Sequence, residues 1–277
     1  MENFINIPVG DWIERGVDWI LDNLEPLLDA IAWVLEILTD SFVSGLQAIP
    51  IPLFVLLLVA LSWWRVSWRF AIFAILAMGL IMGMDLWPET IKTLSLVLAS
   101  ALAALIVGLP VGVAMSRNDT VEAIIRPLLD LMQTMPPFVY LIPAAIFFGL
   151  GTVPGAIATV VFCMPPVVRL TNLGIRQVNR EQIEAGLAFG CNRRQLLTKI
   201  QLPMALPSIM AGVNQTIMLA LSMVVIASMI GAGGLGNTVL TGIQRLDVGL
   251  GFEGGLGVVI LAILLDRITQ SLGVSHR

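Results

Sequence analysis

Long, nearly uncharged apolar stretches follow one another from residue 50 to the end of the chain, and this feature restricts the fold more than any other. A helix needs about 20 apolar residues to cross a bilayer, where no water satisfies backbone groups. Charged residues make up only 12% of the 277 residues, against roughly 25% in soluble domains, so a soluble enzyme is excluded. The apolar content of 57% excludes a disordered protein. We therefore expect an all-α, polytopic membrane helix bundle with about seven spans, of which the first two are short, at residues 50–64, 69–85, 91–115, 130–150, 153–170, 206–230 and 255–273.

Basic residues gather in alternate connections between these spans. With seven spans, 12 of the 15 basic residues fall on one side, and only Arg15, Lys92 and Arg245 do not. The positive-inside rule makes that side cytoplasmic. We therefore expect a multi-pass protein of the bacterial cytoplasmic (inner) membrane, with its N-terminus and the 231–254 connection outside and its C-terminus in the cytoplasm. The residues on the basic side are Arg65, Arg69, Arg117, Arg126, Arg169, Arg176, Arg180, Arg193, Arg194, Lys199, Arg267 and Arg277.

The first 48 residues differ from the rest, because they carry nine acids and a single base. Their apolar residues recur at alternating spacings of four and three, which is typical of an amphipathic helix. We expect two such helices, joined at residues 23–25, with Pro26 starting the second. Burying Asp29 and Glu36 in hydrocarbon would cost about 2.5–3.5 kcal/mol each, so these helices are expected in the interface or packed on the bundle. The expected organisation is an interfacial, extracytoplasmic segment at 1–48, two accessory spans at 49–88, and a core at 89–277 with a cytoplasmic loop at 171–204.

All seven tryptophans precede residue 90. Four of them stand at ends of expected spans, where an aromatic belt anchors a protein in the membrane interface. The alternative is an aromatic cage for a quaternary ammonium ligand, but the later spans contain no tryptophan to build one. The four tryptophans at span ends are Trp63, Trp64, Trp68 and Trp87.

No pattern in the chain indicates catalysis, a resident cofactor or nucleic-acid binding. Residues 231–236 match G-x-G-x-x-G, but a membrane span precedes them instead of the strand that a dinucleotide site needs. We interpret them as flexible backbone at the outer end of a span. The chain has no P-loop motif, and Cys163, Cys191 and His276 make no metal-binding spacing. The two cysteines are expected to be free thiols, and His276 is expected to be solvated.

The 171–204 stretch is too polar to span a membrane and contains a spaced motif. Glu184-Ala-Gly186 is followed after three residues by Gly190, and after nine more by Ile200-Gln-Leu-Pro203. This resembles the coupling motif of ABC importer permeases, E-A-A-x3-G-x9-I-x-L-P, with Gly186 at the third position. The small residues let another protein approach closely, Glu184 can accept hydrogen bonds or cap a helix, and Pro203 ends the element. The alternative is an ordinary amphipathic loop helix with a proline stop.

Further segments resemble the glycine betaine/proline betaine (ProW-type) permease family, which has choline permeases as close relatives. These segments are 131–143, 210–229, 242–247 and 259–267, so the resemblance is dense over residues 85–277 and loose before. The resemblance implies a type I ABC importer, in which two permease copies pair with two cytoplasmic ATPase subunits that hold ATP and Mg²⁺. It also implies a periplasmic or tethered solute-binding protein, and as solute glycine betaine, proline betaine or choline, with trimethylamine N-oxide as a further candidate. The coupling residues that it implies are Glu184, Ala185, Gly186, Gly190, Ile200, Leu202 and Pro203.

Two spans carry the polar and aromatic residues that a translocation pathway requires. Pro136 and Pro137 each lack a backbone donor, so they free carbonyls at membrane depth. Phe138 and Tyr140 offer aromatic faces to a trimethylammonium group. The alternatives are that the prolines kink a packed helix, that the aromatic rings are core, and that the polar side chains join helices. The expected pathway residues are Gln133, Thr134, Pro136, Pro137, Phe138 and Tyr140, with Asn214, Gln215, Thr216 and Ser222.

Two other classes of function remain open from the sequence. An ion-coupled secondary carrier would act without an ATPase, but such carriers more often place carboxylates at mid-depth in the membrane, and the expected spans lack them. A membrane enzyme or a structural scaffold is the third possibility, and no catalytic set of residues supports the enzyme.

Overall fold

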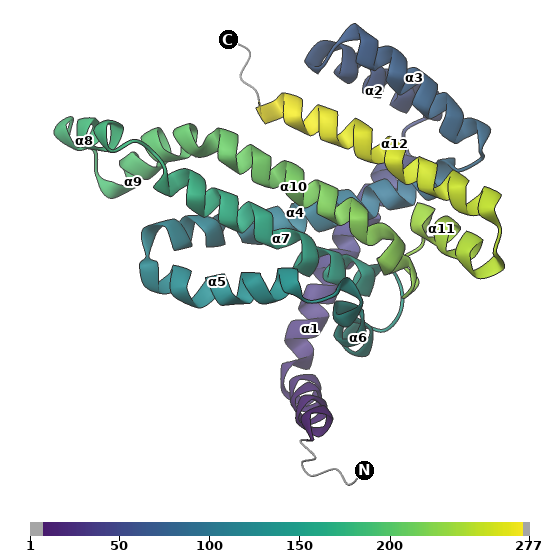
Figure 1. Ribbon diagram of the computed structural model, residues 1–277, viewed down its shortest axis with the longest axis horizontal. Coiled ribbons are helices and arrows are strands. Elements are labelled where there is room, and N and C mark those ends of the chain that lie inside the picture. Colours follow the sequence, from purple (N-terminus) through teal and green to yellow (C-terminus); the bar gives the residue numbers. More distant parts are fainter. Residues whose placement is uncertain (1–7, 274–277) are drawn as a thin grey trace, which may run out of the picture.

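The computed structural model describes residues 8–273, and these residues form helices without a β-strand (Figure 1). The predictions for Glu2, His276 and Arg277 lie outside the described residues. The helices are α1 (Val9–Gln47), α2 (Ile51–Arg65), α3 (Trp68–Gly83), α4 (Trp87–Arg117), α5 (Asp119–Thr134), α6 (Pro137–Phe148), α7 (Thr152–Arg176), α8 (Arg180–Ala188), α9 (Arg193–Leu196), the π-helical turn η1 (Leu197–Gln201), α10 (Leu202–Ser228), α11 (Gly234–Arg245) and α12 (Val248–Gly273).

The centre of the bundle is α7, which packs against α4 on one side and α10 on the other. Glycines make the close approach possible, as small residues do between membrane helices. A Cβ on Gly112 of α4 would lie 2.7 Å from the Val168 carbonyl oxygen of α7. A Cβ on Gly212 of α10 would lie 3.0 Å from the Val167 Cα. Both neighbours are backbone atoms, so the three helices meet nearly backbone to backbone.

Within residues 8–273, fewer helices than the expected seven reach spanning length. Four do so as single helices: α4, α7, α12, and a continuous helix from Arg193 to Ser228 that contains α9, η1 and α10. Two bent pairs, α1 with α2 and α5 with α6, raise the number to six if each counts as one span. The remaining expected span is α3, whose 16 residues extend only about 24 Å, less than the hydrocarbon core of about 30 Å.

The prediction of two N-terminal helices was wrong, because α1 is a single helix of 39 residues with Pro26 inside it. Pro26 removes one hydrogen bond, to the carbonyl of Asp22, but both residues are exposed, so water can satisfy that carbonyl. The second half of α1 packs on the bundle, where Leu35 and Thr39 are buried. The helix is bent by 99° against α2 and crosses the direction of α4, α7 and α10 (Figure 1).

The expected span at 130–150 and the connection before it also differ from the structure. Residues 119–134 form α5, and the chain then bends by 102° into α6. The break lies at Met135 and Pro136, which have extended backbone with ψ of 136° and 137°. Two consecutive prolines explain it, because the residue before a proline is kept out of the helical region. Arg126, expected in a loop, therefore lies within a helix.

Candidate functional sites

The motif residues of the 171–204 stretch are brought together by α8, which lies with α9 at one end of the bundle (left in Figure 1). Asn179 caps the start of α8 by accepting from the Glu181 backbone N–H at 3.2 Å. Gly190 ends it with a φ of +80°, a conformation that favours glycine. The Gly190 N–H donates to Leu187 O at 2.9 Å and the Cys191 N–H to Gly186 O at 3.0 Å. These two bonds form a Schellman motif.

The face of α8 that carries Gly186 rests on the first turns of the long helix that continues into α10. Gly186 is buried, and a Cβ there would overlap Ile200 Cδ1 and lie 3.0 Å from Leu196 Cδ1. Helix α8 therefore packs closely against the side chains of Leu196 and Ile200 at this motif position. A hollow of about 420 Å³ lies beside the contact, lined by Gln182, Ala185, Gly186, Phe189, Cys191, Lys199, Ile200, Pro203 and Met204.

Two details of this loop correct the sequence interpretation. Pro203 does not end the element, because Arg193 to Ser228 form one helix. The π-helical turn η1 directly precedes Pro203, and such wider winding accommodates the missing proline N–H. Glu184 is exposed and lies in the middle of α8, so it caps no helix here, and within residues 8–273 it forms no side-chain hydrogen bond or ion pair. Leu202 is half-buried at the start of α10.

Tyr140 stabilises the break between α5 and α6. Pro136 has no N–H to donate to the carbonyl four residues earlier, that of Met132, and the Tyr140 hydroxyl donates to this carbonyl instead. Its ring is buried and faces Phe162 of α7, with 6.5 Å between ring centroids. Phe138, in contrast, is 52% exposed. The structure therefore does not bring Phe138 and Tyr140 together as an aromatic pair, and the hydroxyl has a structural partner.

The polar residues of α10 divide into two groups. Asn214 joins helices, because its amide donates to Asp266 of α12 at 2.9 Å and its oxygen accepts from Thr269 at 2.5 Å. Thr216 is fully buried, and its hydroxyl has no partner among the described residues. The exposed residues are Ser222, whose hydroxyl donates to Met218 O within the helix, and Gln215, which lines a hollow of about 410 Å³ between α10 and α12.

Helix α5 presents three distinct faces. Its buried face, with Leu129 at the centre, packs on Met115, Val167 and Val168. A second flank exposes Ile124, Leu128 and Leu131, which suits contact with lipid. Between these faces runs a polar stripe at helical spacing: Asp119, Glu122, Arg126, Asp130 and Gln133.

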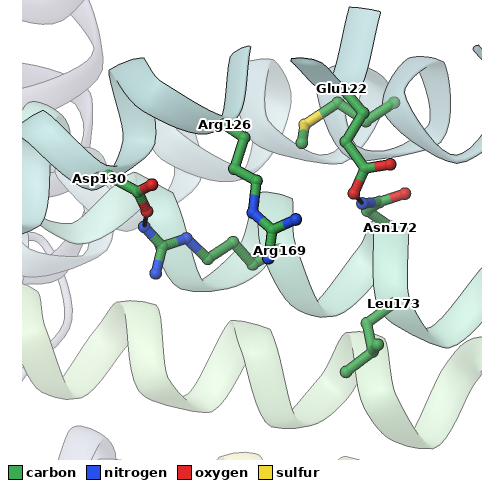
Figure 2. A pocket seen from close by; sticks show the side chains of 7 residues that line it. Glu122, Arg126, Asp130, Arg169, Asn172 and Leu173 are labelled. Carbon is green, nitrogen blue, oxygen red and sulfur yellow. Dashed lines mark hydrogen bonds and ion pairs between the residues drawn. The ribbon is translucent and has the colours of Figure 1, made fainter. Parts of the chain in front are cut away.

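The polar stripe of α5 faces charged residues of α7 across a hollow of about 250 Å³ (Figure 2). Arg169 pairs with Asp130 at 2.6 Å, and the Asn172 amide donates to Glu122 at 3.0 Å. Arg176 pairs with Asp119 at 2.7 Å and with Glu122 at 2.9 Å, and it also donates to the Met115 carbonyl at 2.8 Å. We call the polar stripe of α5 together with Arg169, Asn172 and Arg176 the α5–α7 cluster.

Sequence reasoning placed position 130 at the start of an expected span and Arg169 on the basic side, and the structure pairs Asp130 with Arg169. It missed Glu122, Arg126 and Asn172 as members of one site. The sequence did carry a signal for this site, because polar residues recur at helical spacing at positions 119, 122, 126, 130 and 133. The site could be recognised only with the knowledge that this segment is a helix alongside α7.

The comparisons with known proteins agree with this architecture. Residues 104–273 match the family described as "Binding-protein-dependent transport system inner membrane component". The glycine betaine/proline betaine transport system permease protein ProW of Escherichia coli (strain K12) is 45% identical over 98% of this chain and 77% of its own length. The glycine betaine/carnitine transport permease protein GbuB of Listeria monocytogenes serotype 1/2a (strain 10403S) is 49% identical over 98% of this chain and 97% of its own.

A solved structure supports the fold independently. A chain in an inward-facing conformation of the MetNI methionine ABC transporter superposes with a TM-score of 0.61, over 69% of this chain and 96% of that chain. The sequence identity is 21%, so this likeness concerns the arrangement of helices alone.

Proposed function

Because the chain belongs to the family of binding-protein-dependent transport system inner membrane components, we propose that it is the permease subunit of an ATP-driven importer for quaternary ammonium solutes of the glycine betaine class. The named solutes of its relatives, glycine betaine, proline betaine and carnitine, support this class. Such a permease carries out no catalysis itself. ATP and Mg²⁺ belong to a separate ATPase subunit.

The observation that carries the proposal is the seating of α8 on the first turns of the helix that becomes α10. Gly186 of α8 packs closely against Ile200, which belongs to the long helix from Arg193 to Ser228. In this proposal a movement of α8 therefore moves that membrane-spanning helix. Two apolar side chains at the C-terminal end of α8 are exposed: Phe189 is 90% exposed and Leu187 is 54% exposed. Exposed aromatic anchors of this kind dominate protein interfaces. We assign them, with Glu184, to the contact with an ATPase subunit.

The pathway is proposed between two copies of this chain, one ATPase subunit docking under each α8. Gln133, Thr134, Pro136, Phe138 and Ser222 are exposed on a single chain, which suits a surface shared by two copies. Tyr140 and Asn214 are positioning residues in this proposal, since their polar groups hold the α5–α6 break and the α10–α12 contact.

The orientation follows from the placement of the basic residues. The end of the bundle with α8 carries Arg180, Arg193, Arg194 and Lys199, and we propose that it faces the cytoplasm. The start of α7 and α11 then lie outside, where a solute-binding protein docks. The amphipathic α1, which crosses the direction of the spans, lies in the outer interface.

A mild-detergent pull-down of the tagged chain from its own cells, with mass spectrometry, tests the proposal. We expect an ATP-binding subunit and a solute-binding protein, and the latter can be titrated with glycine betaine, choline and trimethylamine N-oxide. Phe189→Ala should weaken capture of the ATPase subunit by roughly tenfold, as loss of an interface anchor does. Leu150→Ala is the matched control, since Leu150 is 78% exposed but follows α6, away from α8. A reproducible homo-oligomer without an ATPase would contradict the proposal and favour a secondary carrier.

A further inference from the structure

We propose that Arg126 binds the carboxylate of the transported solute on the inner half of the pathway, which makes it a residue that determines specificity. The inference rests on the proposed function. It concerns the α5–α7 cluster, which lies apart from the coupling motif.

The exposure of the cluster's charges indicates which surface of the chain lines the pathway. Arg126 follows the start of α5 at Asp119 by seven residues, or roughly 10 Å along the helix. Asp130 lies one turn deeper, and its side chain is 57% exposed on the single chain. Ionisable side chains at membrane depth face a water-filled cavity or other protein and not lipid. The lipid-compatible flank of α5 is the opposite one, with Ile124 and Leu128.

Arg126 is the cation of this cluster that has no carboxylate partner. The cluster contains three acids and three arginines, which would allow one ion pair for each arginine. Instead, Arg176 pairs with both Asp119 and Glu122, and Arg169 pairs with Asp130. Arg126 therefore forms no ion pair within residues 8–273. In Figure 2 its side chain reaches toward α7 between the Asp130–Arg169 pair and the Glu122–Asn172 pair.

The hollow matches the chemistry of a small zwitterion. It measures about 250 Å³, and its walls offer an unpaired guanidinium and the carboxylates of Asp130 and Glu122. A guanidinium binds a carboxylate through two parallel hydrogen bonds, and Arg126 is the arginine left for this contact, because Arg169 and Arg176 already pair with Asp130 and Glu122. Glycine betaine, proline betaine and carnitine all carry a carboxylate, whereas choline does not. Arg126 is therefore assigned to the group that distinguishes these solutes from choline.

The first experiment tests whether the cluster faces water. Arg126→Cys and Leu128→Cys are each reconstituted with the ATPase subunit, and a membrane-impermeant, water-soluble thiol reagent is added to both sides. Mass spectrometry of the labelled peptides separates these positions from the native cysteines. We expect modification at 126 and none at 128. Equal labelling at both positions, or none at 126, would overturn the inference.

The second experiment measures transport in proteoliposomes with the ATPase subunit and the loaded solute-binding protein. Arg126→Gln should reduce glycine betaine uptake by roughly tenfold to a hundredfold, the value of a hydrogen bond to a charged group. Hydrolysis stimulated by the binding protein should stay within about twofold of wild type. Arg126→Lys should recover only part of the uptake, because lysine keeps the positive charge but cannot form the two parallel hydrogen bonds. Arg117→Gln, at the exposed end of α4, is the control and should transport normally.

The outcomes separate this inference from the proposed function. If the wild-type complex takes up glycine betaine and the Arg126→Gln variant does so equally well, only the role of Arg126 is refuted. Parallel loss of uptake and hydrolysis in Arg126→Gln would show a structural role and would also refute it. A wild-type complex that transports no quaternary ammonium solute would refute the proposed function itself.

Discussion

Gly190→Ala should uncouple the loop from its ATPase subunit without disturbing the membrane bundle. Gly190 has a φ of +80° and an ideal Cβ there would touch nothing within 4 Å, so the effect of alanine is purely conformational. The left-handed conformation costs an L-residue about 1–2 kcal/mol. If that energy is released when the chain leaves the Schellman turn, the ratio of native to non-native turn conformations falls roughly 5- to 30-fold. Phe189, which directly precedes the turn, then loses its fixed direction.

The assay is the affinity of the solubilised permease for its ATPase subunit, together with hydrolysis stimulated by the loaded binding protein. Both should fall, by at most roughly 5- to 30-fold, while the thermal midpoint of the permease alone stays unchanged. Gly190→Asn should be milder, because asparagine tolerates this conformation. Gly79→Ala is the matched control, since Gly79 has an ordinary helical φ and free space around its Cβ. Wild-type affinity for Gly190→Ala would refute the assignment of the turn.

Three further substitutions test the packing, each by equilibrium unfolding in mixed detergent. Tyr140→Phe should cost about 1 kcal/mol, because the Met132 carbonyl freed by the proline break loses its donor; no change would show that another group satisfies it. Gly236→Ala should cost about 1–3 kcal/mol, since its Cβ would overlap the Val224 carbonyl oxygen and backbone cannot give way; a neutral result would contradict the contact between α10 and α11. Thr216→Val should be neutral or stabilising, because the buried hydroxyl has no partner among the described residues; a loss above about 1 kcal/mol would reveal one.

Local features of the chain were the ones that the sequence predicted well. Within the 171–204 stretch the small motif residues lie on one short helix and its closing turn, whereas Glu184 caps no helix and Pro203 does not end the element. The glycines at 231 and 233 adopt φ of +91° and +74° at the end of α10, a conformation that glycine tolerates. Such features depend on backbone chemistry that neighbouring residues determine.

Features that depend on contacts between distant helices escaped prediction. The pairing of Asp130 with Arg169 joins residues 39 apart, and α5 itself looked like a loop followed by a span. The consecutive prolines at 136 and 137 permit either a kinked helix or a sharp break. The break is stabilised by Tyr140, whose hydroxyl bonds to Met132 eight residues earlier. Nothing in the local pattern of apolar residues distinguishes these outcomes.

The continuity of α1 through Pro26 has a similar explanation. A proline inside a helix costs a hydrogen bond and kinks the axis, which favoured two helices. The carbonyl that loses its donor lies on the exposed side of α1, and Leu35 and Thr39 in the second half of the helix pack on the bundle. Tertiary packing therefore decides whether the helix continues.

The energy source of uptake distinguishes the proposed ATP-driven importer from a secondary carrier. The purified permease, its ATPase subunit and the loaded solute-binding protein are reconstituted in proteoliposomes, and radiolabelled glycine betaine uptake is followed with ATP, without ATP, and with imposed proton or sodium gradients. We expect uptake only when ATP is present on the side of α8, with no dependence on either gradient. Accumulation driven by an ion gradient in the absence of ATP would contradict this expectation.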